Sequence, residues 1–242
     1  MEKTVTEAIA YRRAVRVFED IPIDQEHVRN CIRNGALAPT SSNLQLWEFI
    51  HVTKPDTLKA ISKCCFDQNA AKTARQIVVV VARRDLWRKR ARANTQFLQT
   101  QFENNTDPQR WKRRRKMAMN YYGKLIPTLY TEFLGFLGLI RFLFFWVVGL
   151  FRPIYRQVRK SDLRIVAHKS AALAAENFMI SMAAIGYDTC PMEGFDSLRV
   201  KKVLGLPASA EINMIIGCGI RNEKGIYGPR FRIPFEEVYT QI

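Results

Sequence analysis

The sequence lacks the residues from which several kinds of site are built. Its three histidines, His27, His51 and His168, lie far apart, and its five cysteines form no CxxC pair. We therefore expect no metal site and no disulfide framework, and an odd number of cysteines without a framework is typical of reduced thiols in the cytoplasm. The N-terminal stretch MEKTVTEAIAYRRAV has no apolar signal-peptide core, which argues against secretion. No internal repeat, low-complexity linker or dinucleotide fingerprint occurs.

Acidic residues are also scarce: 22 Asp and Glu stand against 38 Lys and Arg, for a formal net charge of +16. The imbalance lies in one segment. Residues 83–164 hold 19 Lys and Arg and 5 Asp and Glu, a net of +14, whereas the rest holds 19 and 17, a net of +2. Charge concentrated in this way indicates a surface that meets an anionic partner rather than a requirement of the fold.

Apolar periodicity predicts helices and strands on both sides of this basic segment. We expect helices over residues 4–14, 24–37, 56–65 and 162–185, and strands over 47–53, 76–82 and 212–220. In the second helix, Asp24 is a typical N-cap and the buried face runs from Val28 to Leu37. The run QIVVVVA at 76–82 is typical of a strand buried on both faces. Neither side has enough strands for a sheet, so residues 1–83 and 165–242 are expected to form one domain of α/β or α+β type, with 84–164 inserted into it.

Four short patches outside the insertion have a characteristic order and spacing. They are Arg12-Arg13-Ala14-Val15-Arg16, the stretch APTSSNLQLWEF at 38–49, Pro191-Met192-Glu193-Gly194, and PRFRIP at 229–234. Together they resemble the nitroreductase family of FMN enzymes, over residues 4–83 and 165–242. The resemblance implies an α+β fold with a central mixed sheet flanked by helices. It also implies an interlocked homodimer in which residues of both subunits form each FMN site.

Arginines could hold the phosphate of such a cofactor. Arg12 and Arg13 lie in the first patch, and Arg230 and Arg232 are two apart, hence on one side of an extended segment. By the resemblance, these positions bind the phosphate and ribityl chain. Arg16 matches a cation beside the flavin N1 and O2 edge, where it would make the cofactor a better hydride acceptor.

The resemblance assigns the other site residues as well. Ser41, Ser42, Asn43 and Gln45 would reach the partner's flavin, although Leu46 replaces the proline usual before the tryptophan. The patch from Pro191 to Gly194 would be a turn over the flavin's central ring, with a backbone N–H of Glu193 or Gly194 at N5. The expected catalytic residues are therefore Arg16, Glu193 and Gly194. The remaining expected cofactor contacts are Ala14, where a serine is common, Met192, and Asp67 with Gln68 at the pyrimidine edge.

The insertion has an apolar stretch at residues 125–155, and between Phe133 and Phe151 its only charge is Arg141. Its length approaches the ~20 residues of a transmembrane helix. A single crossing would, however, divide the catalytic domain between two sides of the membrane. We therefore expect an interfacial helix pair or a shallow re-entrant segment, with Arg141 near the bend or reaching the headgroups and Tyr130, Trp146 and Tyr155 at interface depth.

Two other interpretations of the insertion stay open. The apolar run could be a core or dimer-interface helix, and the basic runs 83–92 and 110–116 could bind nucleic acid or serve as a localisation signal. Because the aromatic residues cluster in a block instead of alternating with the basic ones, we expect no nucleic-acid partner. Anionic lipid agrees better with the basic flanks, and the insertion could also form a lid over the flavin.

The sequence therefore predicts an FMN-dependent reductase that passes hydride from NADH or NADPH through flavin N5 to a lipophilic electrophile, such as a quinone or a nitroaromatic. The expected location is the cytoplasm, with peripheral or monotopic attachment to an anionic membrane surface through residues 84–164. An alternative is a membrane-associated flavin-binding or scaffolding protein with little turnover.

Overall fold

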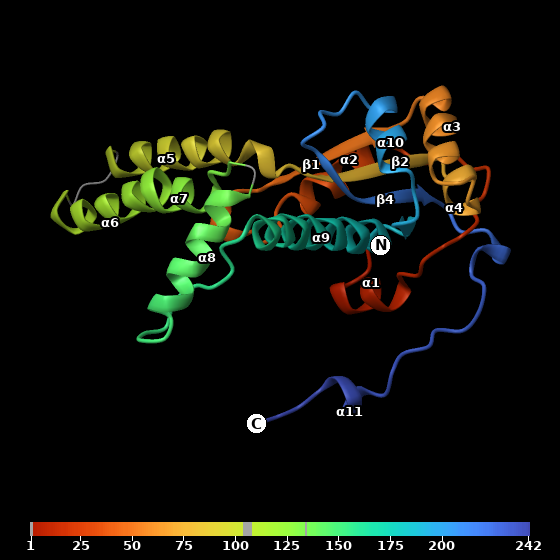
Figure 1. Ribbon diagram of the computed structural model, residues 1–242. Helices are drawn as coiled ribbons and strands as arrows, with labels where there is room; N and C mark the ends of the chain where they lie inside the picture. The colour runs from red at the N-terminus through yellow and green to blue at the C-terminus, as the bar shows by residue number, and fades with distance from the viewer. Residues whose placement is uncertain (1, 104–107, 134) are drawn as a thin grey trace.

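The computed structural model describes residues 2–103, 108–133 and 135–242 (Figure 1). Before the insertion lie α1 (Val5–Tyr11), α2 (Gln25–Gly35), η1 (Ser41–Asn43), β1 (Trp47–Val52), α3 (Pro55–Cys64), α4 (Asn69–Lys72) and β2 (Gln76–Ala82). The insertion holds η2 (Arg84–Leu86), α5 (Trp87–Glu103), α6 (Pro108–Asn120), η3 (Tyr121–Leu125), α7 (Ile126–Tyr130) and α8 (Phe136–Val148). The helix α9 (Lys160–Ala184) begins within the last residues of the insertion. It is followed by β3 (Asp188–Met192), α10 (Ser197–Val203), β4 (Glu211–Gly219), η4 (Glu223–Gly225) and α11 (Phe235–Val238).

The four strands form one sheet in the order β1-β2-β4-β3, so strands from both sides of the insertion share it. Every pair of neighbouring strands is antiparallel, and among the described residues a parallel contact occurs only at the isolated bridge between Ala14 and Thr189. The expected mixed pairing is thus limited to this bridge. The reason is the order of the strands. The strands β2 and β3 run in the same direction, but they do not pair because β4 lies between them and is antiparallel to both.

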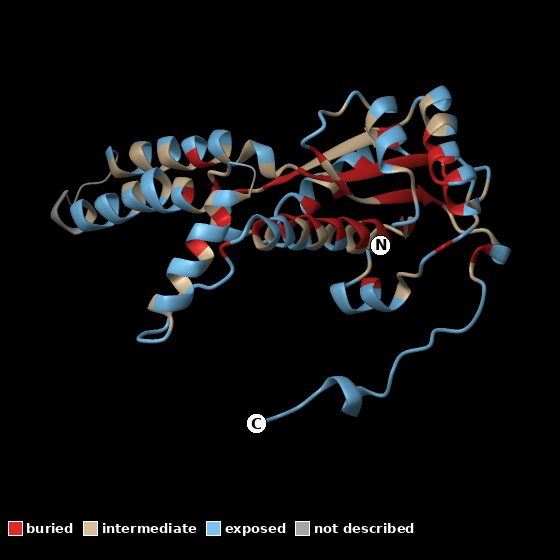
Figure 2. Cartoon of the chain, in the orientation of Figure 1, coloured by how far each residue is buried: buried red, intermediate tan, exposed pale blue. Residues whose placement is uncertain are grey.

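Helices cover both faces of the sheet, and β2 is buried along its whole length (Figure 2). Val78 and Val80 belong to a core shared with α2 and α9, while Ile77 and Val79 belong to a second core with α3 and α10. This explains why QIVVVVA has no polar alternation. The helix α9 approaches α2 closely, since a Cβ on Gly35 would lie 2.9 Å from the Ala174 carbonyl oxygen.

Most predicted elements are present, with differences at their ends. Asp24 caps α2 as expected, since its Oδ1 accepts hydrogen bonds from the backbone N–H groups of Glu26 and His27. The expected burial of Leu37 is wrong: α2 ends at Gly35, so Leu37 lies outside the helix and is exposed. Pro191, expected in a turn, lies in the edge strand β3 instead.

The insertion projects from one end of the sheet as a separate group of helices (Figure 1). It begins where Arg83 donates its backbone N–H to Leu46 and pairs with Glu48 and Asp85. Within the described ranges no helix combines the length and the apolar composition needed to cross a membrane. The apolar helix α8 has 13 residues.

Arg141 differs from its expected position on this helix. Its guanidinium is buried, pairs with Glu132, and donates to the carbonyl oxygens of Thr128 and Thr131 at 3.0 and 2.8 Å. It therefore faces the protein rather than headgroups, because a charge in a mainly apolar helix is stabilised best by a partner and by unpaired carbonyl groups. Tyr130, also expected at interface depth, is buried, whereas Trp146 and Tyr155 are exposed.

Candidate functional site

Arginines from the two ends of the chain line one cavity of about 300 Å³. Arg12, Arg13 and Arg16 come from the segment after α1, and Arg230 and Arg232 come from the C-terminal segment. The two segments are tied together through main-chain oxygens. Arg13 donates to the Gly228 carbonyl at 2.7 Å, and Arg230 donates to the Arg12 carbonyl at 2.6 Å.

The charge of this arginine cluster is largely uncompensated. Arg230 is exposed, and slight desolvation, followed by the positive charges of Arg13, Arg232 and Arg12, lowers its pKa. In the part of the chain that the structure describes, the cluster's one ion pair is Arg12 with Glu176, at 3.7 Å. Guanidinium groups that repel one another are stabilised by a multiply charged anion that accepts several hydrogen bonds, as a phosphate does. The donor set therefore fits the phosphate of FMN.

The segment that carries Arg16 is fixed through its backbone. Val15 donates its N–H to the Thr189 carbonyl at 3.1 Å, and Arg16 donates to the Gly225 carbonyl at 2.7 Å. A Cβ on Gly225 would lie 2.4 Å from the Val17 oxygen, so only glycine permits this approach. The side chain of Arg16 is exposed, and its charge acts on Cys190 in β3. Arg16 thus lies beside the edge strand that leads to Glu193.

A second group of expected residues lies next to the arginines. The Gln68 side chain donates from Nε2 to the Gly194 carbonyl at 2.7 Å, which orients the peptide after β3. Glu193 and Gly194 are exposed, whereas Met192 is buried in the core, so its side chain is turned away from this surface. Asn69 donates to the Tyr227 hydroxyl at 3.3 Å and so connects this group with the arginine cavity.

Asp67 is placed differently from its neighbour Gln68. It accepts a hydrogen bond from the Ser62 hydroxyl at 3.2 Å and lines another cavity, together with Asp20 and Arg75. Its φ of 51° is in the left-handed region, so the chain reverses direction at this point. The structure consequently brings Gln68, but not the side chain of Asp67, into contact with Gly194.

The third group, Ser41 to Gln45, lies far from the other two within one chain. This loop precedes β1, at the opposite edge of the sheet from β3. Trp47, next to this loop, pairs with Ala82 at one end of β2. Thr189 of β3 pairs with Cys218 of β4, which in turn pairs with Gln76 at the other end of β2. At about 3.3 Å per residue, the two ends of β2 are about 20 Å apart. One chain therefore cannot bring this loop to its own arginine cluster.

The insertion holds this loop in place. Ser42, Asn43 and Gln45 have φ values of 55°, 50° and 48°, which are uncommon for residues other than glycine. Tyr122 donates to the Ser42 carbonyl at 3.0 Å, and the hydroxyls of Ser42 and Tyr121 lie 2.6 Å apart. Asn94 on α5 accepts from the Asn43 side chain at 2.7 Å and donates to its carbonyl at 2.9 Å.

Comparison with known proteins identifies the fold. The profile of the nitroreductase family matches residues 9–220. The chain belongs to the nitroreductase family. Protein DrgA of Synechocystis is 27% identical over 219 residues, covering 90% of this chain and 84% of that protein. The Bacillus subtilis protein ydfN has the same fold with a TM-score of 0.73 and 22% identity, covering 98% of both chains. A protein from Exiguobacterium sibiricum solved in complex with FMN has a TM-score of 0.68 and 18% identity, covering 99% of this chain and 98% of that one.

As a member of the nitroreductase family, the protein is an FMN-dependent oxidoreductase with NADH or NADPH as electron donor. The α+β fold, the enzyme class and the cofactors expected from the sequence are confirmed. Sequence reasoning missed Tyr227 and Asn69, which join two parts of the site, and the residues Asn94, Tyr121 and Tyr122 that hold the loop. Tyr227 could have been found from its place directly before the Gly228-Pro229 turn signal.

Cysteine and histidine chemistry is not supported. All five cysteines, each within the described ranges, are buried and free of disulfides. Burial raises the pKa of Cys31 to about 11 and that of Cys65 to about 12, so neither is a reactive thiolate at neutral pH. Among the described residues, no three His, Cys, Asp or Glu side chains are grouped as metal ligands.

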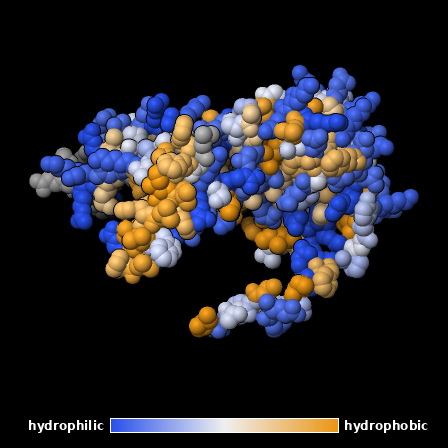
Figure 3. Space-filling view, viewed as in Figure 1, coloured by the Kyte–Doolittle hydropathy of each residue, from blue (hydrophilic) through white to orange (hydrophobic). Residues whose placement is uncertain are grey.

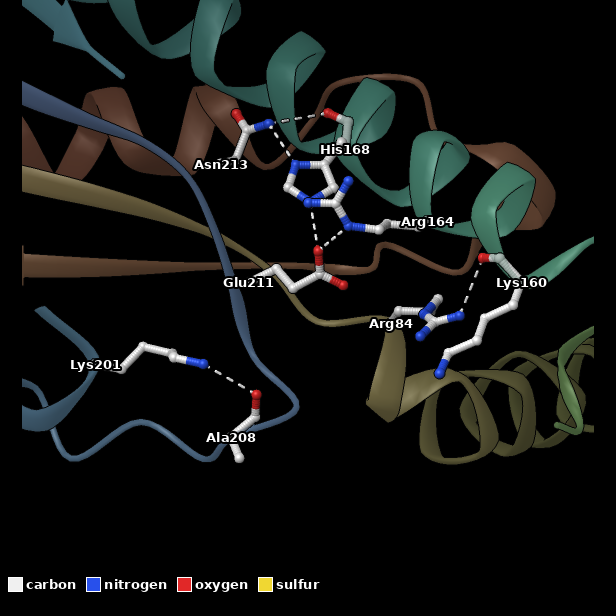
Figure 4. A network of polar contacts seen from close by, with 8 residues as sticks. All are labelled: Arg84, Lys160, Arg164, His168, Lys201, Ala208, Glu211 and Asn213. Carbon is white, nitrogen blue, oxygen red and sulfur yellow. Dashed lines mark hydrogen bonds and ion pairs between the residues drawn. The ribbon is translucent and has the colours of Figure 1, made fainter. Parts of the chain in front are cut away.

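His168 belongs to a polar network that joins α9 to β4 (Figure 4). Glu211 pairs with Arg164 and accepts from His168 Nε2 at 3.2 Å. Asn213 lies 3.2 Å from the other ring nitrogen of His168. Burial favours the neutral carboxyl, but the hydrogen bonds from Arg164 and His168 outweigh it and lower the pKa of Glu211. This network is structural and joins the first half of α9 to the sheet.

Proposed function

We propose that the arginine cluster holds the FMN phosphate and that residues 1–83 and 165–242 form the catalytic domain. The observation that supports this most directly is the single cavity shared by Arg12, Arg13, Arg230 and Arg232. FMN, when bound, supplies a two-electron carrier that accepts a hydride and passes it on. The arginines bind and orient it through charge-assisted hydrogen bonds.

The residues around β3 have separate roles in this proposal. Arg16 places a fixed cation at the polar edge of the flavin ring, where negative charge increases on reduction. The backbone N–H groups at Glu193 and Gly194 would face the central ring when FMN is bound. Gln68 acts as a positioning residue because its hydrogen bond fixes the Gly194 peptide.

A second copy of the chain completes the site. The loop from Ser41 to Gln45 is too far from its own arginine cluster, so its polar groups would serve the flavin of a partner subunit. Several apolar side chains are exposed in the single chain, among them Val5 and Ile9 on α1. The segment 229–242 is exposed and extends away from the body (Figure 1), and a partner subunit would cover it. The protein would therefore act as a homodimer.

The reaction is a two-electron reduction. NADH or NADPH gives up a hydride and becomes NAD⁺ or NADP⁺, while the acceptor takes up that hydride and one proton from solvent. For a quinone the product is the hydroquinone. The alternative, a flavin-binding protein with little turnover, has no observation in its favour. It is tested by measuring NADH or NADPH oxidation with a quinone as acceptor.

The insertion, residues 84–164, would dock the enzyme on a membrane. Phe136, Leu139, Ile140, Leu143, Phe144 and Val147 recur at helical spacing on α8, and all are exposed. Figure 3 shows this apolar surface on the helix that projects from the body. An exposed, continuous apolar face of this kind is typical of a protein-protein or membrane interaction site.

Charge favours an anionic bilayer as the partner. The basic run Lys112–Lys116 on α6 is exposed, and Arg152 and Arg156 follow α8 directly. Each Lys or Arg near an anionic surface contributes about 1 kcal/mol of attraction. A helix of 13 residues is only about 20 Å long, shorter than the ~30 Å hydrocarbon core, so α8 would lie in the interface and not cross it. With the helix in this position, the enzyme would attach to the cytoplasmic leaflet and would take a lipophilic acceptor from it.

The phosphate assignment is tested with the double variant Arg230→Ala/Arg232→Ala. Wild-type protein should be yellow, release FMN and oxidise NADH or NADPH with a water-soluble benzoquinone. The double variant should lose most of its FMN, because each charge-assisted hydrogen bond contributes ~1.5–3 kcal/mol. Arg29→Ala/Arg33→Ala, which removes two exposed arginines of α2, is the matched control. Full FMN content in the site variant would refute the assignment, and FMN without turnover would favour the binding-protein alternative.

A further inference from the structure

An apolar cavity of about 240 Å³ lies between the insertion and the loop that contains Ser42. Its wall includes Ile126 and Leu129 of α7, Phe145 of α8 and Leu163 of α9. Two further cavities beside the insertion are lined in part by charged side chains, one by Arg84 and Glu211 and the other by Arg88 and Arg92. Of these three cavities, all formed by described residues, the one behind Ser42 suits an apolar ligand best.

The position of the cavity connects two surfaces of the proposed enzyme. Its lining includes Ser41 and Ser42, in the loop that would contact the partner's flavin. It also includes Phe145 and Tyr155, from α8 and the segment after it. The adjacent Phe144 is exposed on the outer face of α8. The cavity thus lies directly behind the helix that would meet the bilayer.

The polar groups around Ser42 are already hydrogen-bonded to one another. The Ser42 and Tyr121 hydroxyls lie 2.6 Å apart, and Tyr122 donates to the Ser42 carbonyl at 3.0 Å. The interior beyond them is aliphatic and aromatic, and such cavities take up hydrocarbon rather than water. Apolar cavities of ~150 Å³ already accommodate a benzene-sized ligand, so this volume suffices for part of an alkyl or isoprenoid chain.

We propose that this cavity binds the hydrocarbon chain of an amphipathic electron acceptor and so presents its redox-active ring at Ser41 and Ser42. The inference rests on the proposed function, since the ring must reach a flavin completed by that loop. It assigns the substrate class as a quinone-like ring with a long apolar chain. The insertion would then select acceptors by their chains, in addition to attaching the enzyme to the bilayer.

The test compares benzoquinones that share one ring but carry either no chain or a decyl chain, with the holoenzyme in detergent-free buffer. For wild-type protein the KM should fall at least tenfold with the decyl chain, because each buried methylene contributes a factor of about 4. A second measurement is independent of turnover. Binding of 1-octanol to the holoenzyme, followed by titration calorimetry, should show a saturable site.

Two substitutions from different elements reduce the cavity. Leu129→Trp on α7 and Val166→Phe on α9 should each weaken octanol binding and remove the KM advantage of the decyl chain. The KM of the chainless quinone should stay within about twofold, since a factor of 2 is only ~0.4 kcal/mol. Leu198→Trp, an exposed residue on α10, is the matched control and should behave as wild type in both measurements.

The outcomes separate this inference from the proposed function. If the chainless quinone is reduced but chain length has no effect on KM and octanol does not bind, the cavity assignment is wrong while the reductase assignment stands. If Leu129→Trp and Val166→Phe both keep the lower KM for the decyl quinone, the cavity assignment is also overturned. Absence of any quinone reduction together with saturable octanol binding would contradict the proposed reaction instead.

Discussion

At the scale of single residues, the site depends on cations that have few anionic partners in the protein. Arg230 and Arg13 are held by main-chain carbonyl oxygens, which position a guanidinium without neutralising it. The positive charge of the cluster therefore stays largely uncompensated and can attract an anionic ligand. Gly225 has a supporting role, because its missing Cβ allows the chain to approach the Arg16 backbone.

Arg16 provides a prediction at this scale. Arg16→Gln should leave FMN content nearly unchanged, since the phosphate arginines remain, but should lower the two-electron midpoint potential of the bound flavin by about 30–60 mV. The reason is the loss of a cation that stabilises the reduced ring. Spectroelectrochemical titration measures the shift, and Arg16→Lys is the control that restores the charge. A potential unchanged in Arg16→Gln would place Arg16 away from the ring.

At the scale of elements, α9 is held to β4 by polar contacts in its first half, and small side chains such as Ala174 pack closely along its middle. Glu211 on β4 connects to Arg164 and His168 on α9, close to the point where the insertion ends. The hydrogen bonds from Arg164 and His168 stabilise the ionised form of the Glu211 carboxyl group. The network therefore makes the attachment of α9 dependent on pH.

This dependence has a definite sign. The pKa of Glu211 is lowered below its ordinary value of 4.5, so its contribution to stability is complete above that pH and is lost as the pH falls through the folded-state pKa. Glu211→Gln should reduce the free energy of unfolding at pH 7 by about 1–3 kcal/mol. Urea unfolding at several pH values should show this difference shrinking in acid. A difference that grows in acid would contradict the assignment.

The helix α8 gives a second prediction for an element. Replacing Leu143 and Phe144, both exposed on its outer face, by glutamate should abolish co-sedimentation with anionic liposomes, because buried charge opposes insertion into the interface. Wild-type binding should be only partly released by salt, which screens the basic residues but not the apolar contacts. The exposed pair Leu198 and Val203 of α10, replaced in the same way, is the control. Unchanged pelleting of the α8 variant would show that this helix does not bind the membrane.

At the scale of the whole molecule, the candidate site is divided between opposite ends of the sheet. The arginine cluster and Gly194 lie near the β3 edge, whereas Ser42 precedes β1 and contacts the insertion. In the proposed function, a complete site would therefore require two chains. In such a dimer, the insertion of one subunit would lie beside the flavin bound by the arginines of the other.

Mixed dimers test this arrangement. One chain carries Arg230→Ala/Arg232→Ala, and the other carries Ser41→Trp, which blocks the exposed loop position. If the sites are shared, each isolated variant should bind little FMN, but the purified heterodimer should contain one intact site and bind one FMN. Two differently tagged chains and absorbance of the released flavin provide the measurement. A heterodimer without FMN would show that each site is built within one chain.

Much of the fold could be predicted from the sequence because the relevant forces are local. The strands β1, β2 and β4 and the helices α2, α3 and α9 follow from apolar periodicity, caps and glycine stops, each acting within a few residues. The strand β3 was not predicted, since Asp188–Met192 is short and contains a proline that is tolerated because β3 is an edge strand. The short helix α10 was missed for the same lack of a long periodic signal.

By itself the sequence determined the family, the cofactor class and the concentration of positive charge, because these are written in residue types and spacing. Only the tertiary structure decided which residues meet. It separated Ser42 from the arginine cluster, turned Arg141 inward to Glu132, and placed Asn94 and Tyr122 against the loop. These outcomes depend on the strand order, on burial and on contacts between residues distant in the chain, and local sequence patterns do not encode such distances.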